Sequence, residues 1–118
     1  MDTVTSGAVE ELAGEILRLA DRLRSLSDLR LSRPLPPHPS RAEAAHAVAQ
    51  LLADGAAQLE GRPIRPVPRL HDLAVGDQVA VTGTDLVAAA HAVDSVTTGV
   101  TELVRAAAAA CRELRATL

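Results

Sequence analysis

Residues 75–83 read VGDQVAVTG, and the structure that this stretch adopts decides the fold. Taken alone it resembles a β-strand between two turns, because Val79 and Val81 alternate with small or polar residues. Over a longer window, apolar or small residues recur at spacings of four and three at twelve positions, from Val75 to Leu114. A strand would also need a partner, and we find no second strand candidate. The heptad pattern therefore predicts a helix.

Two glycines lie inside this predicted helix, and each costs about 1 kcal/mol relative to alanine. Gly76 and Gly83 are seven residues apart, on one edge of the apolar seam. Small residues at this edge let helix backbones approach closely, so we interpret the glycines as packing positions. The same edge carries Ala90, Thr97, Val104 and Cys111 further along the chain, Ala13 and Ala20 in the first predicted helix, and Ala42, Ala49 and Ala56 in the second.

Two earlier segments show the same helical spacing. We predict a first helix over residues 7–29, with Ser6 as its N-cap, and a second over residues 41–60. Ser40 and Glu43 form a capping box at the start of the second helix, and Gly61 ends it. The seam positions are Val9, Leu12, Ile16, Leu19, Leu23 and Leu26 in the first helix, and Ala45, Val48, Leu52, Gly55 and Leu59 in the second.

The long third segment contains a weak point at residues 94–99, DSVTTG. These residues are poor helix formers, and Asp94, Ser95 and Thr98 are good N-cap candidates. A break here gives helices over residues 72–93, capped by Asp72, and 97–117. Without a break, the segment is one continuous helix about 68 Å long. The sequence favours the break and leaves the continuous helix as an alternative.

Two proline-rich connectors, residues 30–40 and 62–70, join these helices. We expect both to be extended and polyproline-like. A dozen extended residues reach about 35 Å, which exceeds the roughly 30 Å length of a 20-residue helix. Neighbouring helices therefore need not alternate in direction. The sequence predicts one all-α domain over residues 1–118, an antiparallel or mixed four-helix bundle packed by Ala, Leu and Val.

The composition lacks Phe, Tyr, Trp and Lys, and all twelve basic residues are arginines, as is typical of a chain encoded by a high-GC bacterial genome. A core of Ala, Val and Leu buries little area per residue. This favours self-association, and we predict a homo-oligomer, a dimer or larger. The net charge of −3 and the missing aromatic residues argue against nucleic-acid and membrane partners. No signal peptide is visible, so we expect a cytoplasmic protein.

Chemical motifs are sparse. Glu43 and His46 form one E-x-x-H pair, half of a di-metal motif, on a face away from the seam. Three further histidines are scattered, so we predict no metal site. Cys111 is either a semi-buried apolar residue or, as the alternative, a reactive or disulfide-forming thiol. No catalytic or cofactor-binding motif occurs, so we predict a non-enzymatic protein without a cofactor.

We therefore predict that the protein works through protein–protein interaction, as a self-associating, adaptor or regulatory module. An alternative is a bundle that binds a small apolar ligand or cofactor in its aromatic-free core. Candidate partner-binding residues are of two kinds, apolar side chains off the seam and arginines on the second connector. They are Leu17, Leu29, Val81 and Val87, and Arg62, Arg65 and Arg69.

Overall fold

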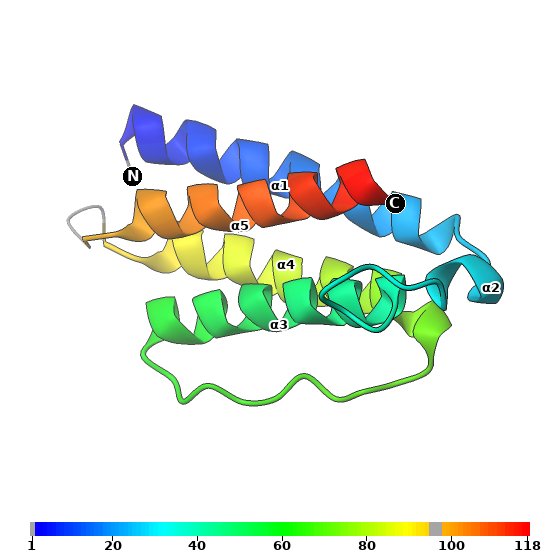
Figure 1. Ribbon diagram of the computed structural model, residues 1–118. Coiled ribbons are helices and arrows are strands. Elements are labelled where there is room, and N and C mark those ends of the chain that lie inside the picture. Colours follow the sequence, from blue (N-terminus) through cyan, green and yellow to red (C-terminus); the bar gives the residue numbers. More distant parts are fainter. Residues whose placement is uncertain (1, 95–97) are drawn as a thin grey trace.

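The computed structural model describes residues 2–94 and 98–118, and it is a helical bundle measuring 45 × 27 × 22 Å (Figure 1). The residues that the structure describes contain no β-strand, so the all-α prediction is confirmed. The stretch VGDQVAVTG forms the first half of a helix. The four long helices are α1 (Thr3–Arg24), α3 (Arg41–Glu60), α4 (Val75–Ala92) and α5 (Val100–Thr117), and the short elements are α2 (Asp28–Leu31) and the 3-10 turn η1 (Asp72–Ala74).

The bundle has a mixed topology. In Figure 1, α1 and α5 run in one direction, and α3 and α4 run in the other. Helix α1 packs against both α4 and α5, and α3 packs against α4, whereas the side between α3 and α5 is sparsely packed. Three sides of the bundle are therefore closed, and the fourth is more open.

The second connector makes the parallel arrangement of α3 and α4 possible. It is extended and returns along the length of α3 to the start of α4 (Figure 1), as the sequence predicted. Gln50 holds it by accepting a hydrogen bond from Val67 N (2.7 Å) and donating one to Arg65 O (3.0 Å). The Nε2 atom of His46 lies 2.9 Å from Val67 O, and Gln78 donates to Pro68 O.

The prediction for the first connector is wrong. Instead of extending, the chain forms α2, where the Ser27 hydroxyl accepts from Arg30 N and the side chain of Leu31 is buried. A tight turn follows, with backbone hydrogen bonds in both directions between Leu35 and His38 and a cis bond between two prolines. Burial of one leucine thus folds this connector back at the end of α1.

Helix α1 is displaced from its predicted bounds of 7–29. It begins at Thr3 because the Asp2 carboxylate, not the Ser6 hydroxyl, caps it by accepting from Thr5 N at 2.7 Å. It ends at Arg24, since the chain turns and Ser27 starts α2. Its seam prediction is confirmed, because all six predicted seam residues are buried.

The other helix ends mix confirmed and wrong predictions. The Ser40 hydroxyl accepts from Glu43 N at 3.0 Å, which is one half of the predicted capping box, whereas the Glu43 carboxylate pairs with Arg69. Gly61 ends α3 with a φ of 66°, as predicted. Asp72 does not cap α4, because it opens the 3-10 turn η1 that precedes that helix.

The predicted break before the last helix is confirmed, since α4 ends at Ala92 and α5 begins at Val100. The continuous-helix alternative is thereby excluded. The N-cap of α5 is Gly99, with a φ of 86°, and not Asp94 or Thr98. The third candidate, Ser95, and the predicted helix start at residue 97 lie outside the described residues.

The packing role predicted for the glycines is confirmed. A Cβ atom on Gly83 would lie 2.6 Å from Ile16 Cγ2, and one on Gly76 would lie 3.2 Å from the backbone oxygen of Ala20. Helices α1 and α4 thus approach more closely than side chains would allow. Among the described residues, no helix is long and apolar enough to cross a membrane.

Candidate interaction surface

Leu17 and Val87, both predicted to bind a partner, line the same groove. We call it the lateral groove; it lies between α1 and α4, has a volume of about 240 Å³ and is lined by Ala13, Ile16, Leu17, Ala20, Ala80, Thr84 and Val87. Leu17 is 63% exposed, whereas Val87 is half-buried. The lining contains no charged side chain, and the Thr84 hydroxyl already donates to Ala80 O. A partner would therefore pay little desolvation cost here.

Val81 and Arg65 line a second groove, which we call the connector groove. It has a volume of about 520 Å³ and lies between the second connector, α3 and α4, with a lining that includes Pro66, Pro68 and Leu70. Val81 is 62% exposed. The lateral and connector grooves flank a single exposed strip of α4, because Ala80 lines the first and Val81 the second. We call the lateral groove, this strip and the connector groove the α4 face.

The other predicted partner-binding residues lie elsewhere or are engaged within the chain. Leu29 is 71% exposed on α2, at the end of the bundle. Arg62 pairs with Glu60 at 3.2 Å. Arg69 pairs with Glu43 at 2.8 Å, so it joins the second connector to the start of α3. The three connector arginines therefore do not form one patch.

A third groove runs along the sparsely packed side between α3 and α5. It consists of two adjoining hollows of about 380 and 420 Å³, which share Ala47 and Leu51. Its walls are alanine-rich, but Asp54 and Gln58 line one hollow and His38 and Glu113 the other. A protein partner that covered the whole groove would strip water from these polar groups, so this groove is less suited to an apolar protein surface than the lateral groove.

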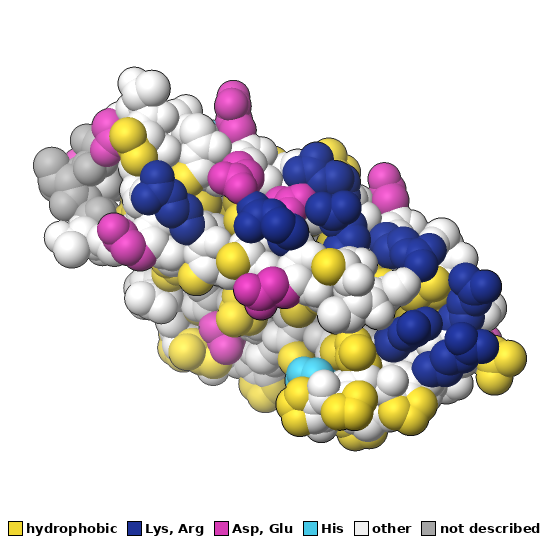
Figure 2. Space-filling model, turned by 45° about the horizontal axis from the view of Figure 1, so that its top comes forward, with side chains coloured by type: hydrophobic (Ala, Val, Ile, Leu, Met, Phe, Trp, Pro, Cys, Tyr) yellow, Lys and Arg dark blue, Asp and Glu magenta, His cyan; other side chains and the backbone are white. Residues whose placement is uncertain are grey.

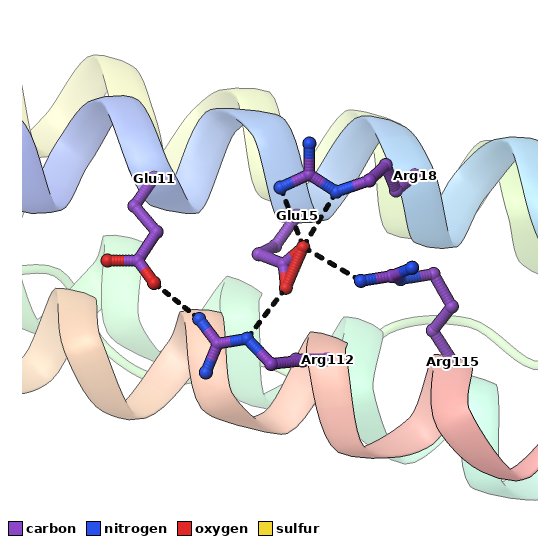
Figure 3. Close-up of polar contacts among 5 residues, drawn as sticks. All are labelled: Glu11, Glu15, Arg18, Arg112 and Arg115. Atoms are coloured by element: carbon purple, nitrogen blue, oxygen red, sulfur yellow. Dashed lines mark hydrogen bonds and ion pairs between the residues drawn. The ribbon is translucent and has the colours of Figure 1, made fainter.

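A buried ion-pair cluster joins α1 to α5 (Figure 3). The Glu15 side chain is 3% exposed, and its Oε1 atom accepts from Arg18 Nε (2.8 Å) and Arg115 Nη2 (3.1 Å). Arg112 Nε lies 3.0 Å from Glu15 Oε2, and the same arginine pairs with Glu11 at the surface. Burial raises the pKa of Glu15, but the Arg18 hydrogen bond and the charges of Arg18, Arg115 and Arg112 outweigh it, so the pKa lies below its ordinary value.

Sequence reasoning missed this cluster. Glu15 precedes the seam residue Ile16, and the sequence pattern did not single it out. The arginines that reach it, Arg112 and Arg115, are about a hundred residues away in the sequence. The signal for the cluster is a glutamate beside the seam of α1 together with two arginines one turn apart on α5. This signal can be recognised only when α1 and α5 are known to be parallel neighbours.

Cys111 lies on α5 and is fully buried. Burial raises the pKa of its thiol to about 11, and the nearby Glu15 charge adds to this effect. The buried apolar interpretation of this residue is therefore confirmed, and the thiolate is strongly disfavoured. Within residues 2–94 and 98–118, no group of three or more His, Cys, Asp or Glu side chains is placed to hold a metal ion.

Arginine side chains gather toward the end of the bundle where α1 ends, at the right of Figure 2. Arg30, Arg33 and Arg41 follow the end of α1 and are linked through their backbones, since Arg33 N donates to Arg30 O and Arg41 N donates to Arg33 O. Within the described part of the chain, these three guanidinium groups form no ion pair. This end of the bundle therefore carries guanidinium groups that no described carboxylate pairs with.

Comparison with known proteins gives no relative. No family model matches the chain, and neither a curated protein nor a solved structure matches it.

Proposed function

We propose that this protein acts through protein–protein contact, without catalysis, and that its α4 face binds a second copy of the chain. The observation that carries the proposal is Leu17, which is 63% exposed in a groove without a charged lining residue. Full burial of an exposed leucine is worth about 1.5–3 kcal/mol, so covering the exposed part of Leu17 gains about 1–2 kcal/mol. In a symmetric dimer that gain is made twice.

The composition supports the same proposal. The buried core is built from Ala, Val, Leu, one Ile and one Cys, with no aromatic side chain, so it supplies limited stabilisation for 118 residues. Covering the α4 face would add apolar burial that the single chain lacks.

The test is absolute mass in solution, measured by light scattering with refractive-index detection because the chain has no Trp or Tyr. The expected result is a dimer for the unaltered protein and a 12.3 kDa monomer for Leu17→Glu. Losing two leucine contacts of at least about 1 kcal/mol each corresponds to a rise in the dimer Kd of more than about 25-fold.

Val4→Glu is the matched control. Val4 is on the same helix and is similarly exposed, at 60%, but it does not line the lateral groove. This variant should remain dimeric, with the same helical circular dichroism as Leu17→Glu. A monomeric unaltered protein at high concentration would refute the proposal, as would an unchanged mass for Leu17→Glu.

A second candidate function is binding of a small apolar ligand. The observation that favours it is the groove between α3 and α5, where two adjoining hollows share Leu51 on the sparsely packed side. Native mass spectrometry of the purified protein tests it. A retained apolar molecule that Leu51→Glu releases would support this function, and retention by the variant would contradict it.

A further inference from the structure

The groove between α3 and α5 has the length and the lining to hold a further helix. Its two hollows share Ala47 and Leu51, and Leu51 is 44% exposed. The stretch of α3 that lines the groove, residues 44–58, is about 21 Å long, or roughly four helical turns. Small residues on both walls leave space that the larger side chains of another helix can fill. The further small residues are Ala44, Ala106, Ala107 and Ala110.

No arginine among the described residues lines this groove, but two carboxylates do. Asp54 lines one hollow and Glu113 lines the other, and His38 is the other titratable group among the described lining residues. Neither carboxylate forms an ion pair within the described part of the chain. The Gln50 amide donates to Asp54 Oδ1 at 2.7 Å and so holds that carboxylate at the groove. Any protein segment that fills the groove therefore meets two negative charges.

The two carboxylates lie on opposite walls of the groove. Asp54 belongs to α3 and shares its hollow with Ala106, whereas Glu113 belongs to α5 and lies seven residues beyond Ala106. Seven residues of helix span about 10 Å, or two turns. Leu51 lies between the two carboxylates along the groove, because it lines both hollows. The complementary surface is an apolar stripe with one cation on each flank, about two turns apart.

From this lining we infer that the groove between α3 and α5 binds a basic amphipathic helix of a partner protein. The apolar stripe of that helix covers Leu51 and the alanines, and an Arg or Lys on each flank pairs with Asp54 or Glu113. A purely apolar surface would leave both carboxylates dehydrated and unpaired, which is costly. A second copy of this chain offers no free helix, because its long helices are packed in a bundle of their own.

This inference goes beyond the proposed dimer and does not depend on it. Helix α1 packs against α4 and α5, and α3 packs against α4, so the lateral groove and the groove between α3 and α5 lie on opposite sides of the bundle. Leu17 and Leu51 therefore belong to different surfaces. A dimer that covers Leu17 leaves the second groove free to recruit a partner, as an adaptor does.

A displayed peptide library tests the inference without a known partner. Each peptide is about 16 residues long, a little over four helical turns. Leucine is fixed at helical spacing along one face, and the flanking positions are drawn equally from Arg, Glu, Gln and Ala. Selection uses the unaltered protein, and peptides that also bind Leu51→Gln are discarded, since this change removes the apolar contact without adding a charge.

The expected result is enrichment of arginine on both flanks of the leucine stripe, about two turns apart. Enrichment of glutamate, or equal use of arginine and glutamate, would overturn the inference. A selection that yields no peptide dependent on Leu51 would overturn it as well.

The Kd of the most enriched peptide then tests the role of the two carboxylates. Asp54→Asn/Glu113→Gln keeps the side-chain shapes and removes both charges, so the Kd should rise about fivefold at low salt. The difference should vanish in about 1 M salt, where charges are screened beyond roughly 3 Å. Leu17→Gln, on the opposite side of the bundle, is the matched control and should bind the peptide as the unaltered protein does. An unchanged Kd for the double variant at low salt would contradict the inference.

Two other occupants of the groove would be recognised by mass. A small apolar molecule that native mass spectrometry detects and that the peptide fails to displace would overturn the inference and support the second candidate function. A dimer that Leu51→Gln dissociates and Leu17→Glu does not would show a second copy in this groove, and would overturn both the inference and the proposed function. A monomeric unaltered protein that still binds the basic peptide would refute the proposed dimer alone.

Discussion

Helix α1 contacts its two neighbours in different ways. It packs closely against α4 because Gly76 and Gly83 have no side chain and so leave room for Ala20 and Ile16. It meets α5 through a charged group, because the buried carboxylate of Glu15 holds arginines from both helices (Figure 3). One contact is therefore specified by shape, and the other by charge.

The difference shows how an aromatic-free bundle obtains a unique structure. Alanine and valine surfaces slide over one another at little cost, so apolar burial alone leaves the helix register poorly defined. Glycines that receive a particular side chain fix the register of α1 against α4. A buried charge that must find its partners fixes the register of α1 against α5, since an unpaired buried carboxylate is costly.

The largest expected effect is at the shape-specified contact. Gly83→Val places at least one methyl group within the volume of Ile16, since even a Cβ would lie 2.6 Å from Ile16 Cγ2. We expect a loss of about 3 kcal/mol in the free energy of unfolding, at the upper end of overpacking costs. Urea unfolding followed by circular dichroism at 222 nm measures it.

Gly7→Ala is the control for helix propensity. No atom lies within 4 Å of the position that a Cβ on Gly7 would take, so this change should stabilise α1 by about 0.5–1 kcal/mol. If Gly83→Val were as stable as the unaltered protein, α1 and α4 would not be held by close approach, and the comparison would fail.

A smaller effect is expected at the charge-specified contact. Glu15→Gln keeps the size of the side chain but removes the charge that three arginines share, and we expect a loss of about 1–2 kcal/mol in the free energy of unfolding. The arginines limit the loss, because they are between 36% and 54% exposed and can turn to water. Glu11→Gln is the matched control: Glu11 pairs with Arg112 but is exposed, so its loss should lie near zero.

The pH dependence of stability separates the two contacts further. The folded-state pKa of Glu15 lies below its ordinary value of 4.5, so its stabilisation is complete above that value and is lost as the pH falls through the folded pKa. The unaltered protein should therefore lose more stability than Glu15→Gln between pH 5 and strongly acid conditions. Parallel pH profiles for the two proteins would show that the ion pairs contribute nothing to stability.

The same distinction explains what the sequence could predict. The seam and the small-residue edge were predicted because both repeat every seven residues, and this periodicity specifies apolar burial on each helix. The glycine contact of Gly83 was predicted as a close approach, but its partner Ile16 was not. The Glu15 cluster was not predicted, because it depends on which helices are neighbours. The prediction for the first connector was wrong because burial of one leucine, Leu31, outweighed the extended preference of four prolines.

The smallest expected effect concerns the rate at which the thiol of Cys111, which lies near Glu15, reacts with an alkylating reagent. Raising its pKa from 9.0 to about 11 lowers the thiolate fraction at pH 8 about 100-fold, and burial blocks reagents as well. Alkylation by iodoacetamide at pH 8 should therefore proceed only as fast as the bundle opens. Because the Glu15 charge contributes to this pKa, Glu15→Gln should react faster, whereas Gly7→Ala should not. Equal rates in Glu15→Gln and the unaltered protein would mean that the charge cluster neither disfavours the thiolate nor holds α5 closed against α1.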